Sequence, residues 1–179
     1  MREHLQLLAT YNEWMNLKLY AAAAQLPATE LSANKGAFFG SLMGTLNHIL
    51  VGDRIWLSRF ALHPARHARL DGLRALPVPT ALDQILFDDF HALDAHRKWL
   101  DIMIKEWVAE LTDDDLNHRL RYANTKGVVA VRKFSNVLLH LFNHQTHHRG
   151  QATTLLSQTG IDVGATDLLL LIPDETSPP

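Results

Sequence analysis

The sequence contains no cysteine among its 179 residues. This absence excludes a cysteine nucleophile, a disulfide framework and a thiolate zinc site. No apolar run reaches the roughly 18 residues of a membrane span, and the start has no basic segment followed by an apolar core, so we expect no signal peptide. The net charge is -2, so the chain lacks the excess of basic residues that is typical of a nucleic-acid-binding domain. We therefore expect a cytoplasmic protein with neither membrane nor nucleic acid as a partner.

Several catalytic signatures are also missing. The sequence has no Gly-x-Ser-x-Gly elbow, no phosphate-binding loop and no dinucleotide fingerprint. A serine triad on an α/β sheet and nucleotide-dependent chemistry on such motifs are not supported. Apolar residues make up 47% and charged residues 20%, which is ordinary for a globular protein that buries its own core. Residues 1–179 are therefore predicted to form a single domain.

Apolar residues recur at helical spacing along most of the chain. This pattern predicts four long helices, and Thr80 is the expected N-cap of the third. Phe38 is expected in the apolar stripe of the second helix, and Leu82 and Ile85 in that of the third. The helices are predicted at about residues 2–26, 37–61, 81–110 and 132–159.

The predicted fold is an all-α four-helix bundle. Two short extended runs around a Lys-Gly turn, in LRYANTKGVVAV, predict a small β-hairpin before the last helix. The connections after the second and third helices are long, at about 62–79 and 111–131. A crossover between parallel helices is therefore allowed in place of a simple up-down topology.

Histidine is the anomaly of the composition. There are 11, of which four lie in the predicted last helix between His140 and His148. His144 and His148 fall inside the apolar stripe, about 40° apart around the helix, whereas His140 and His147 fall on its edge. Imidazoles in a core stripe cost desolvation free energy unless their nitrogens are satisfied. Spacing i, i+4 allows both rings to reach one metal ion.

A metal held by this pair needs a ligand from another helix, and His48 is the best candidate. It lies on the flank of the second helix's apolar stripe, on a side with the small residues Ser41, Thr45 and Gly52. Small neighbours favour a cavity over a packed core. Three neutral nitrogens leave at least one coordination position open, which is typical of a catalytic site rather than a structural one.

Other interpretations of these residues stay open. His144 and His148 could be hydrogen-bonded core histidines. His140 and His147 could contact the ligand histidines from outside, lie at the rim of the site or lie on the surface. Asp53, in the apolar sector of the second helix, could pair with an arginine or orient a ligand histidine. Gln151 could donate to a substrate or a ligand, or simply pack. The remaining residues considered are expected elsewhere: His63 and His67 in a connection, Asp113–Asp115 in a solvated turn, and Arg149 toward the far side of the last helix.

Three motifs together resemble one known family. YNEWMN near the start, LNHILVGDRIWLSRF in the second helix and HLFNHQTHHRGQ in the last helix resemble the DinB-like family, as does the ending IDVGATDLL. The similarity covers nearly the whole chain and keeps the order and spacing of the motifs. It implies a four-helix bundle of the DinB/YfiT-like type, usually a homodimer, with a histidine triad that holds a divalent metal ion.

Carried onto this chain, the family's metal ligands are His48, His144 and His148, the residues that helical geometry also selects. The resemblance implies zinc, nickel, iron or manganese as the cofactor. Characterised relatives in the wider superfamily include metal-dependent thiol S-transferases and a mycothiol-dependent maleylpyruvate isomerase. By this resemblance, a low-molecular-weight thiol is a second cofactor to consider.

The first functional hypothesis is a metal-dependent enzyme that transfers a small thiol to an electrophile, with a small-molecule substrate bound between helices. A metal-dependent hydrolase is the runner-up. A second hypothesis is a non-catalytic, metal-stabilised protein of stress response or interaction. The third is a helical dimer that binds no metal.

Overall fold

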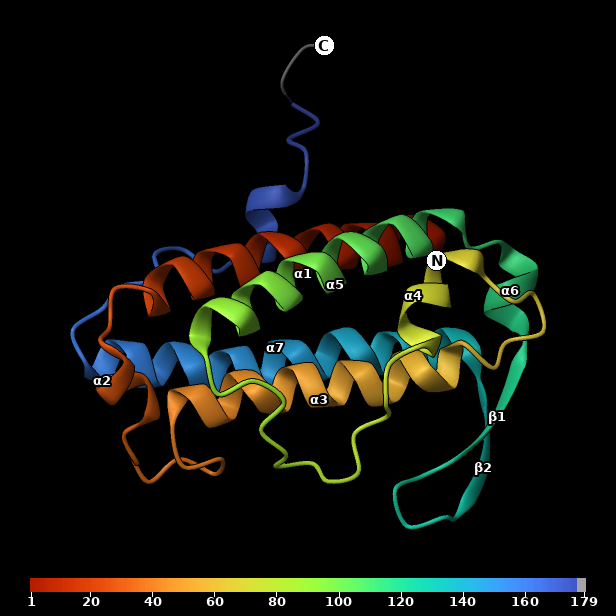
Figure 1. Cartoon of the computed structure of the whole chain (residues 1–179). Helices are drawn as coiled ribbons and strands as arrows, with labels where there is room; N and C mark the ends of the chain where they lie inside the picture. The colour runs from red at the N-terminus through yellow and green to blue at the C-terminus, as the bar shows by residue number, and fades with distance from the viewer. Residues whose placement is uncertain (177–179) are drawn as a thin grey trace.

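Four long helices form two layers in the computed structural model, which describes residues 1–176 (Figure 1). Helix α1 lies beside α5 in one layer, α3 lies beside α7 in the other, and α1 also packs on α7. The predicted all-α four-helix bundle is confirmed. The assignment of residues 1–179 to a single domain stays a prediction, and the last three of those residues lie outside the described range. The long helices are α1 (Arg2–Ala23), α3 (Leu42–Phe60), α5 (Phe90–Glu110) and α7 (Phe134–Gln158).

The bundle contains the crossover that the long connections allowed. Helices α1 and α7 run in one direction and α3 and α5 in the other, so consecutive α3 and α5 are parallel (Figure 1). The connection between them carries two short turns, η1 (Ala68–Leu70) and α4 (Asp71–Arg74), and then returns along the side of α3. Among the described residues, no helix is both long and apolar enough to span a membrane.

The small hairpin before the last helix is confirmed. Strands β1 (Arg119–Ala123) and β2 (Val129–Lys133) pair antiparallel, with Arg119 opposite Lys133. Alternate residues of β1 are buried, including Tyr122, so one face of the hairpin packs on the bundle. The short helix α6 (Asp113–Asn117) precedes it at the end of the bundle. Helix α2 (Ala28–Ser32) and η2 (Leu168–Leu171) complete the fold.

The start of the third long helix was predicted wrongly. Helix α5 begins at Phe90 with Asp89 as its N-cap, so Thr80 caps no helix. Leu82 and Ile85, expected in its apolar stripe, are exposed. The cause is Asn47 in α3, a buried side chain that accepts from the amides of Leu86 and Phe87 and donates to the Phe87 carbonyl, so these backbone groups are not available to a helix.

The second long helix also begins later than predicted. Ser41 caps α3 by accepting a hydrogen bond from the Gly44 amide at 3.0 Å. Gly40 just before it has a φ of 74°, a left-handed conformation that ends any helical path from residue 37. Phe38, expected in the stripe, is 86% exposed. The next residue, Phe39, instead folds back over α3.

A polar network occupies the middle of the bundle. Arg97 in α5 forms ion pairs with Asp53 of α3 and with Asp101, at 2.7 Å for the second pair. Asn16 of α1 donates to the same Asp101 at 3.0 Å, and Gln145 of α7 donates to Asp53 at 2.6 Å. All five side chains are buried. The network therefore joins all four long helices, and buried charges of this kind need partners to be tolerated.

Arg149 contradicts its expected position. It is 3% exposed and donates hydrogen bonds to Asn12 and Gln145. The prediction assumed one buried face on the last helix, but α7 packs against both α3 and α1. Its far side is therefore a second interface.

Candidate metal centre

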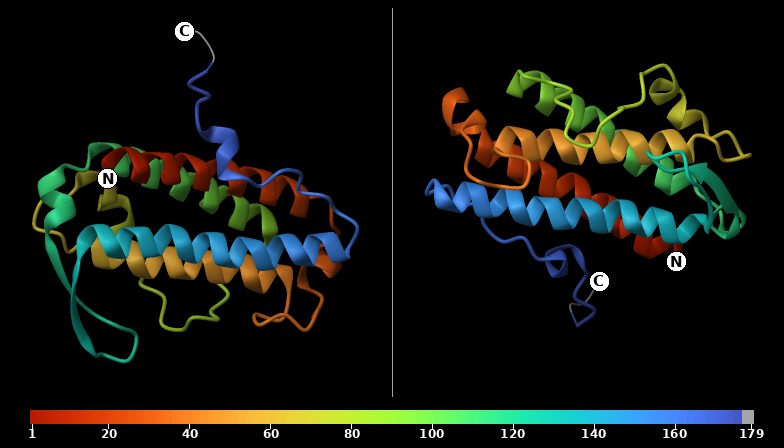
Figure 2. Two further views of the ribbon diagram at one scale, coloured as in Figure 1. Left: turned by 180° about the vertical axis from the view of Figure 1, so that it is seen from behind. Right: turned by 90° about the horizontal axis from the view of Figure 1, so that it is seen from below.

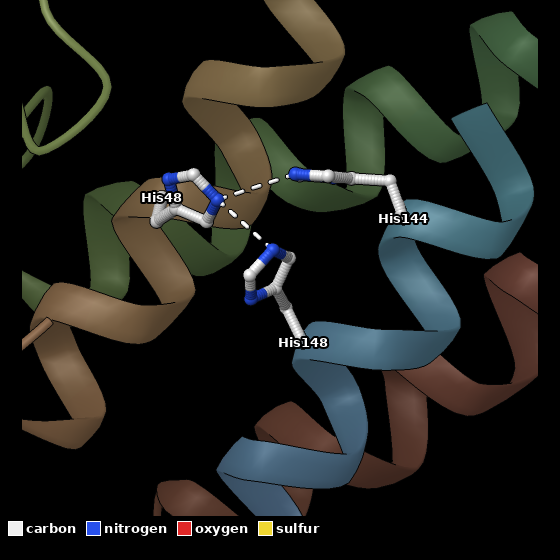
Figure 3. A group of neighbouring side chains, drawn as sticks. All are labelled: His48, His144 and His148. Carbon is white, nitrogen blue, oxygen red and sulfur yellow. Dashed lines mark hydrogen bonds between the residues drawn. The ribbon is translucent and has the colours of Figure 1, made fainter. Parts of the chain in front are cut away.

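The structure brings the three predicted ligand histidines together (Figure 3). His48 projects from α3, and His144 and His148 project from successive turns of α7. The Nε2 atom of His48 lies 3.2 Å from Nε2 of His144 and 3.1 Å from Nε2 of His148. His48 is buried and the other two are half-buried. These three residues are called the histidine triad below.

The tautomer of His48 is fixed by the connection that runs along α3. Its Nδ1 lies 2.7 Å from the carbonyl oxygen of Leu82. A carbonyl can only accept, so Nδ1 carries the proton and Nε2 presents its lone pair to the triad. The ring of Phe39 stacks on the imidazole at a centroid distance of 3.7 Å. Neither neighbour could be expected from the sequence pattern, because each lies in a segment predicted to be helical.

His148 is held in the same way. Its Nδ1 lies 2.8 Å from Oε1 of Gln151, one turn further along α7. This contact places the proton on Nδ1 and leaves Nε2 as an acceptor. Of the roles considered for Gln151, the structure shows contact with a triad histidine, with the amide oxygen accepting rather than the nitrogen donating. Such partners orient ligand histidines in metal sites.

His144 fits its place only because the facing residue on α3 is glycine. A Cβ atom on Gly52 would lie 2.6 Å from Cε1 of His144 and 3.1 Å from its Nδ1. Any side chain at position 52 would therefore push the ring away. The Nδ1 atom is buried and has no hydrogen-bond partner in the described chain.

The surroundings keep the triad neutral. Burial, with His148 and His48 nearby, lowers the pKa of His144 to about 3. Burial also lowers the pKa of His48 and of His148. Two neutral rings that both carry their proton on Nδ1 cannot share a hydrogen bond between their Nε2 atoms. The 3.1 Å approach of His48 to His148 therefore sets two lone pairs against each other, which a cation between them would relieve.

The donor set fits a divalent metal ion. In a tetrahedral zinc site with metal–nitrogen distances of about 2.0–2.1 Å, ligand nitrogens lie about 3.3 Å apart. The two Nε2 separations of the triad are close to this value. Neutral imidazoles suit zinc, nickel and iron among the common ions. These residues could hold such an ion and leave a coordination position for another molecule.

The other candidates do not join the triad. His140 and His147 are exposed, and although their rings lie beside those of His144 and His148, neither belongs to the group of ligand atoms that could hold one ion. Asp53 pairs with Arg97, one of the two roles considered for it, and contacts no triad histidine.

Asp53 nevertheless bears on the position of the triad. It follows Gly52 in sequence, and its partner Gln145 follows His144. The 2.6 Å hydrogen bond from Gln145 to Asp53 thus joins α3 and α7 directly behind the contact between Gly52 and His144. This buried bond fixes the relative position of the two helices that carry the triad.

A second group of potential ligands lies at the other end of α3. Nδ1 of His63 and Nε2 of His67 each lie 3.9 Å from Oδ1 of Asp115, and the group has the spacing to hold a metal ion. His63 and His67 were placed in a connection, as observed, but their meeting with Asp115 was not predicted. The solvated-turn interpretation fails for Asp115, whose side chain is only 12% exposed. Chain reversal after α3 and after α5 brings these segments together.

Comparison with known proteins identifies a family for this sequence. A sequence model described as DinB family matches residues 1–176. The chain is 25% identical over 160 residues to Protein DinB of Bacillus subtilis (strain 168), covering 89% of this chain and 88% of that protein. It is 31% identical over 87 residues to the Uncharacterized protein YrdA of the same organism, covering 49% and 45%. No solved structure gave a significant match.

A helical bundle with three histidines converging between two of its helices defines a class of proteins able to hold a metal ion. Within that class, the chain belongs to the DinB family, as the resemblance of its motifs implied.

Proposed function

We propose that the protein is a metal-dependent enzyme in which His48, His144 and His148 hold a divalent ion. The observation that carries this proposal is the convergence of three neutral Nε2 atoms, two of them with their protons fixed on Nδ1. We further propose that the reaction transfers a small thiol to an electrophile. The class of reaction follows the thiol S-transferases of the wider superfamily.

The chain's own residues prepare the site for this chemistry. When bound, a divalent ion would lower the pKa of a thiol or water and supply a nucleophile at neutral pH. Leu82 and Gln151 hold the rings of His48 and His148 in the ligand tautomer. Phe39 covers the face of His48 and excludes water from it. Such orientation before binding reduces the free-energy cost of assembling the site.

The test is thiol-dependent turnover by tag-free protein. Activity against a panel of thiols and electrophiles should be lost after chelation and restored by zinc, nickel, iron or manganese. His144→Ala should lower kcat/KM at least about 100-fold, whereas the exposed neighbour His147→Ala should stay near wild type. Inactivity of the metal-loaded protein across the panel would overturn the proposed reaction. Turnover of esters or amides without any thiol would favour the hydrolase.

A non-catalytic, metal-stabilised protein is the second candidate. The observation in its favour is that the triad joins two separate helices, α3 and α7, so metal binding would stabilise the folded state by mass action. It predicts a large fall in melting temperature on chelation and no exchangeable position on the metal. Binding of a small thiol to the cobalt-substituted protein, seen as a change in its absorption spectrum, would argue against it.

We also propose that the protein forms a homodimer and binds a small-molecule substrate. The family precedent supports the dimer. Analytical ultracentrifugation of the tag-free protein should give twice the mass of the chain, and a monomer at micromolar concentration would contradict this.

A further inference from the structure

A cavity of about 560 Å³ lies at the C-terminal half of α3, apart from the triad. The helix lines one side, residues 78–80 of the crossover connection line another, and the end of β1 with the start of the hairpin turn lines a third. Most of its surface is apolar, with Ile55, Leu62, Val78 and Tyr122 among the lining residues. This size suits a small molecule.

Arg59 gives this pocket an uncompensated positive charge. Its guanidinium carbon lies 4.7 Å from the ring centre of Trp56 and 5.1 Å from that of Tyr122. The side chain is half-buried, and burial lowers its pKa without removing the charge. Within residues 1–176, no carboxylate lies within ion-pair distance of Arg59. The five N–H donors of a guanidinium match an oxyanion in a planar fork.

The two aromatic rings hold the guanidinium in place. Arginine stacked on aromatic faces loses less conformational freedom when it binds a ligand than a free surface arginine does. Ser58, Thr80 and Asn124 add polar groups to the lining near the apolar surface. The pocket therefore combines one fixed cation, a few hydrogen-bonding groups and an apolar wall.

The pocket lies on the same side of α3 as the triad. His48, Ile55 and Arg59 are spaced at i, i+7 and i+11, which places them within about 40° of one another around a helix, and Arg59 about 16 Å along the axis from His48. His140 lies between the two sites. Its ring is 5.0 Å from that of Trp56 and 6.0 Å from that of His144.

We infer that this pocket binds a small organic anion, whose carboxylate or phosphate pairs with Arg59 and whose apolar part packs on Ile55, Leu62 and Tyr122. Binding of the anion depends only on the pocket. The anion also has a role in the reaction, as the part of the substrate that the pocket holds while the reacting group reaches the triad. That role rests on the proposed function.

Calorimetric titration of the metal-free protein tests the binding. The probes are 3-phenylpropionate, phenyl phosphate and the neutral amide 3-phenylpropanamide, which keeps the apolar body without the charge. At least one anion should bind at least about tenfold tighter than the amide, as expected for hydrogen bonds to a charged group. The preferred anion identifies the head group. Equal binding of the anions and the amide, or no binding of either anion at millimolar concentration, would overturn the inference.

Variants assign the binding to Arg59. Arg59→Gln should weaken the better anion at least about tenfold, and Arg59→Lys should weaken it less, because it keeps the charge without the fork. Arg121→Gln is the matched control, since Arg121 is exposed on the opposite face of the same hairpin. Circular dichroism checks that each variant is folded. Wild-type binding by Arg59→Gln would overturn the inference.

One further variant separates this inference from the proposed function. His144→Ala should lose metal and keep the anion, whereas Arg59→Gln should keep metal and lose the anion. Binding of the anion by a protein that never takes up metal would leave the pocket assigned and remove only its role in the proposed reaction. Loss of anion binding in His144→Ala would contradict the separate pocket.

Discussion

The two histidine groups of this protein share residue types but differ in how they are built. The triad comes from two long helices, with His144 and His148 one turn apart on α7 and His48 facing them from α3. The second group, His63, His67 and Asp115, comes from a connection and a short helix at the end of the bundle. Spacing alone would allow either group to hold a metal ion.

Their hydrogen bonds separate the two groups. In the triad, the outer Nδ1 atoms of His48 and His148 are bonded and the inner Nε2 atoms are left to converge. In the second group, His63 Nδ1 already accepts from the Ala65 amide at 3.1 Å, and Asp115 Oδ2 accepts from the Thr112 amide at 2.8 Å. One group directs its acceptors inward, whereas the other uses them to hold a turn and a helix end. We therefore expect metal in the triad and a structural role for the second group.

The largest expected difference between the two groups is in metal binding after one histidine is removed from each. His144→Ala should lower metal affinity at least about 100-fold, because a direct ligand outweighs the 10–100-fold effect typical of an outer partner. His67→Ala should keep one metal per chain. Elemental analysis of tag-free protein measures both. Loss of metal in His67→Ala, with retention in His144→Ala, would reverse the comparison.

A methyl group at Gly52 should weaken metal binding without removing a ligand. Gly52→Ala should lower metal affinity about 10–100-fold, as for other changes outside the ligand set, because its Cβ would displace His144. Gly150→Ala in α7 is the matched control, since nothing lies within 4 Å of its Cβ. It should retain the affinity and stabilise the helix by up to about 1 kcal/mol. Titration with a competing chelator measures the affinities, and unchanged binding in Gly52→Ala would refute the close fit of the ring.

Asp115→Ala should affect stability and leave metal binding alone. Asp115 and Thr112 form a capping box at the start of α6, and loss of such a cap costs about 1 kcal/mol. Urea unfolding of the metal-free protein measures the change. Asp114→Ala, at an exposed position of the same helix, is the control. An Asp115→Ala protein with normal stability but less bound metal would show that the second group is a metal site.

A graded pH effect is the smallest expected difference. Burial lowers the pKa of His144 to about 3 in the folded protein, against about 6.5 in an unfolded chain. Between these values the unfolded state binds more protons, so the free energy of unfolding rises with pH across the window and falls as pH drops below about 6.5. In metal-free His144→Gln this slope should be shallower. Denaturation at pH 4.5, 5.5 and 7 measures this dependence. If the free energy of unfolding had the same pH dependence in wild type and His144→Gln, the lowered pKa of His144 would be contradicted.

Helical periodicity was enough to find the triad. It places His144 and His148 on one face of their helix, and it places His48 beside Gly52 on a face with small residues. These are local properties of a regular helix, which the sequence specifies without knowledge of its neighbours. The hairpin was predictable for the same reason, since a Lys-Gly turn and its flanking runs are adjacent in sequence.

The start of α5 was not predictable in this way. The segment before Phe90 has apolar residues that continue the helical period, and Thr80 is a suitable N-cap residue. Asn47, more than 30 residues earlier, takes the backbone groups that a helix would have used. A competing hydrogen bond from another element thus overrode the local preference.

The sequence by itself determined the four helices, the hairpin and the choice of His48, His144 and His148, because these depend on spacing within single segments. Only the tertiary structure decided that Arg149 is buried, that Asp115 meets His63 and that Arg59, beside a pocket, has no acidic partner among residues 1–176. Each depends on which faces of which helices come together. The crossover and the packing of α7 against two neighbours bring together residues whose separation in the chain carries no signal of contact.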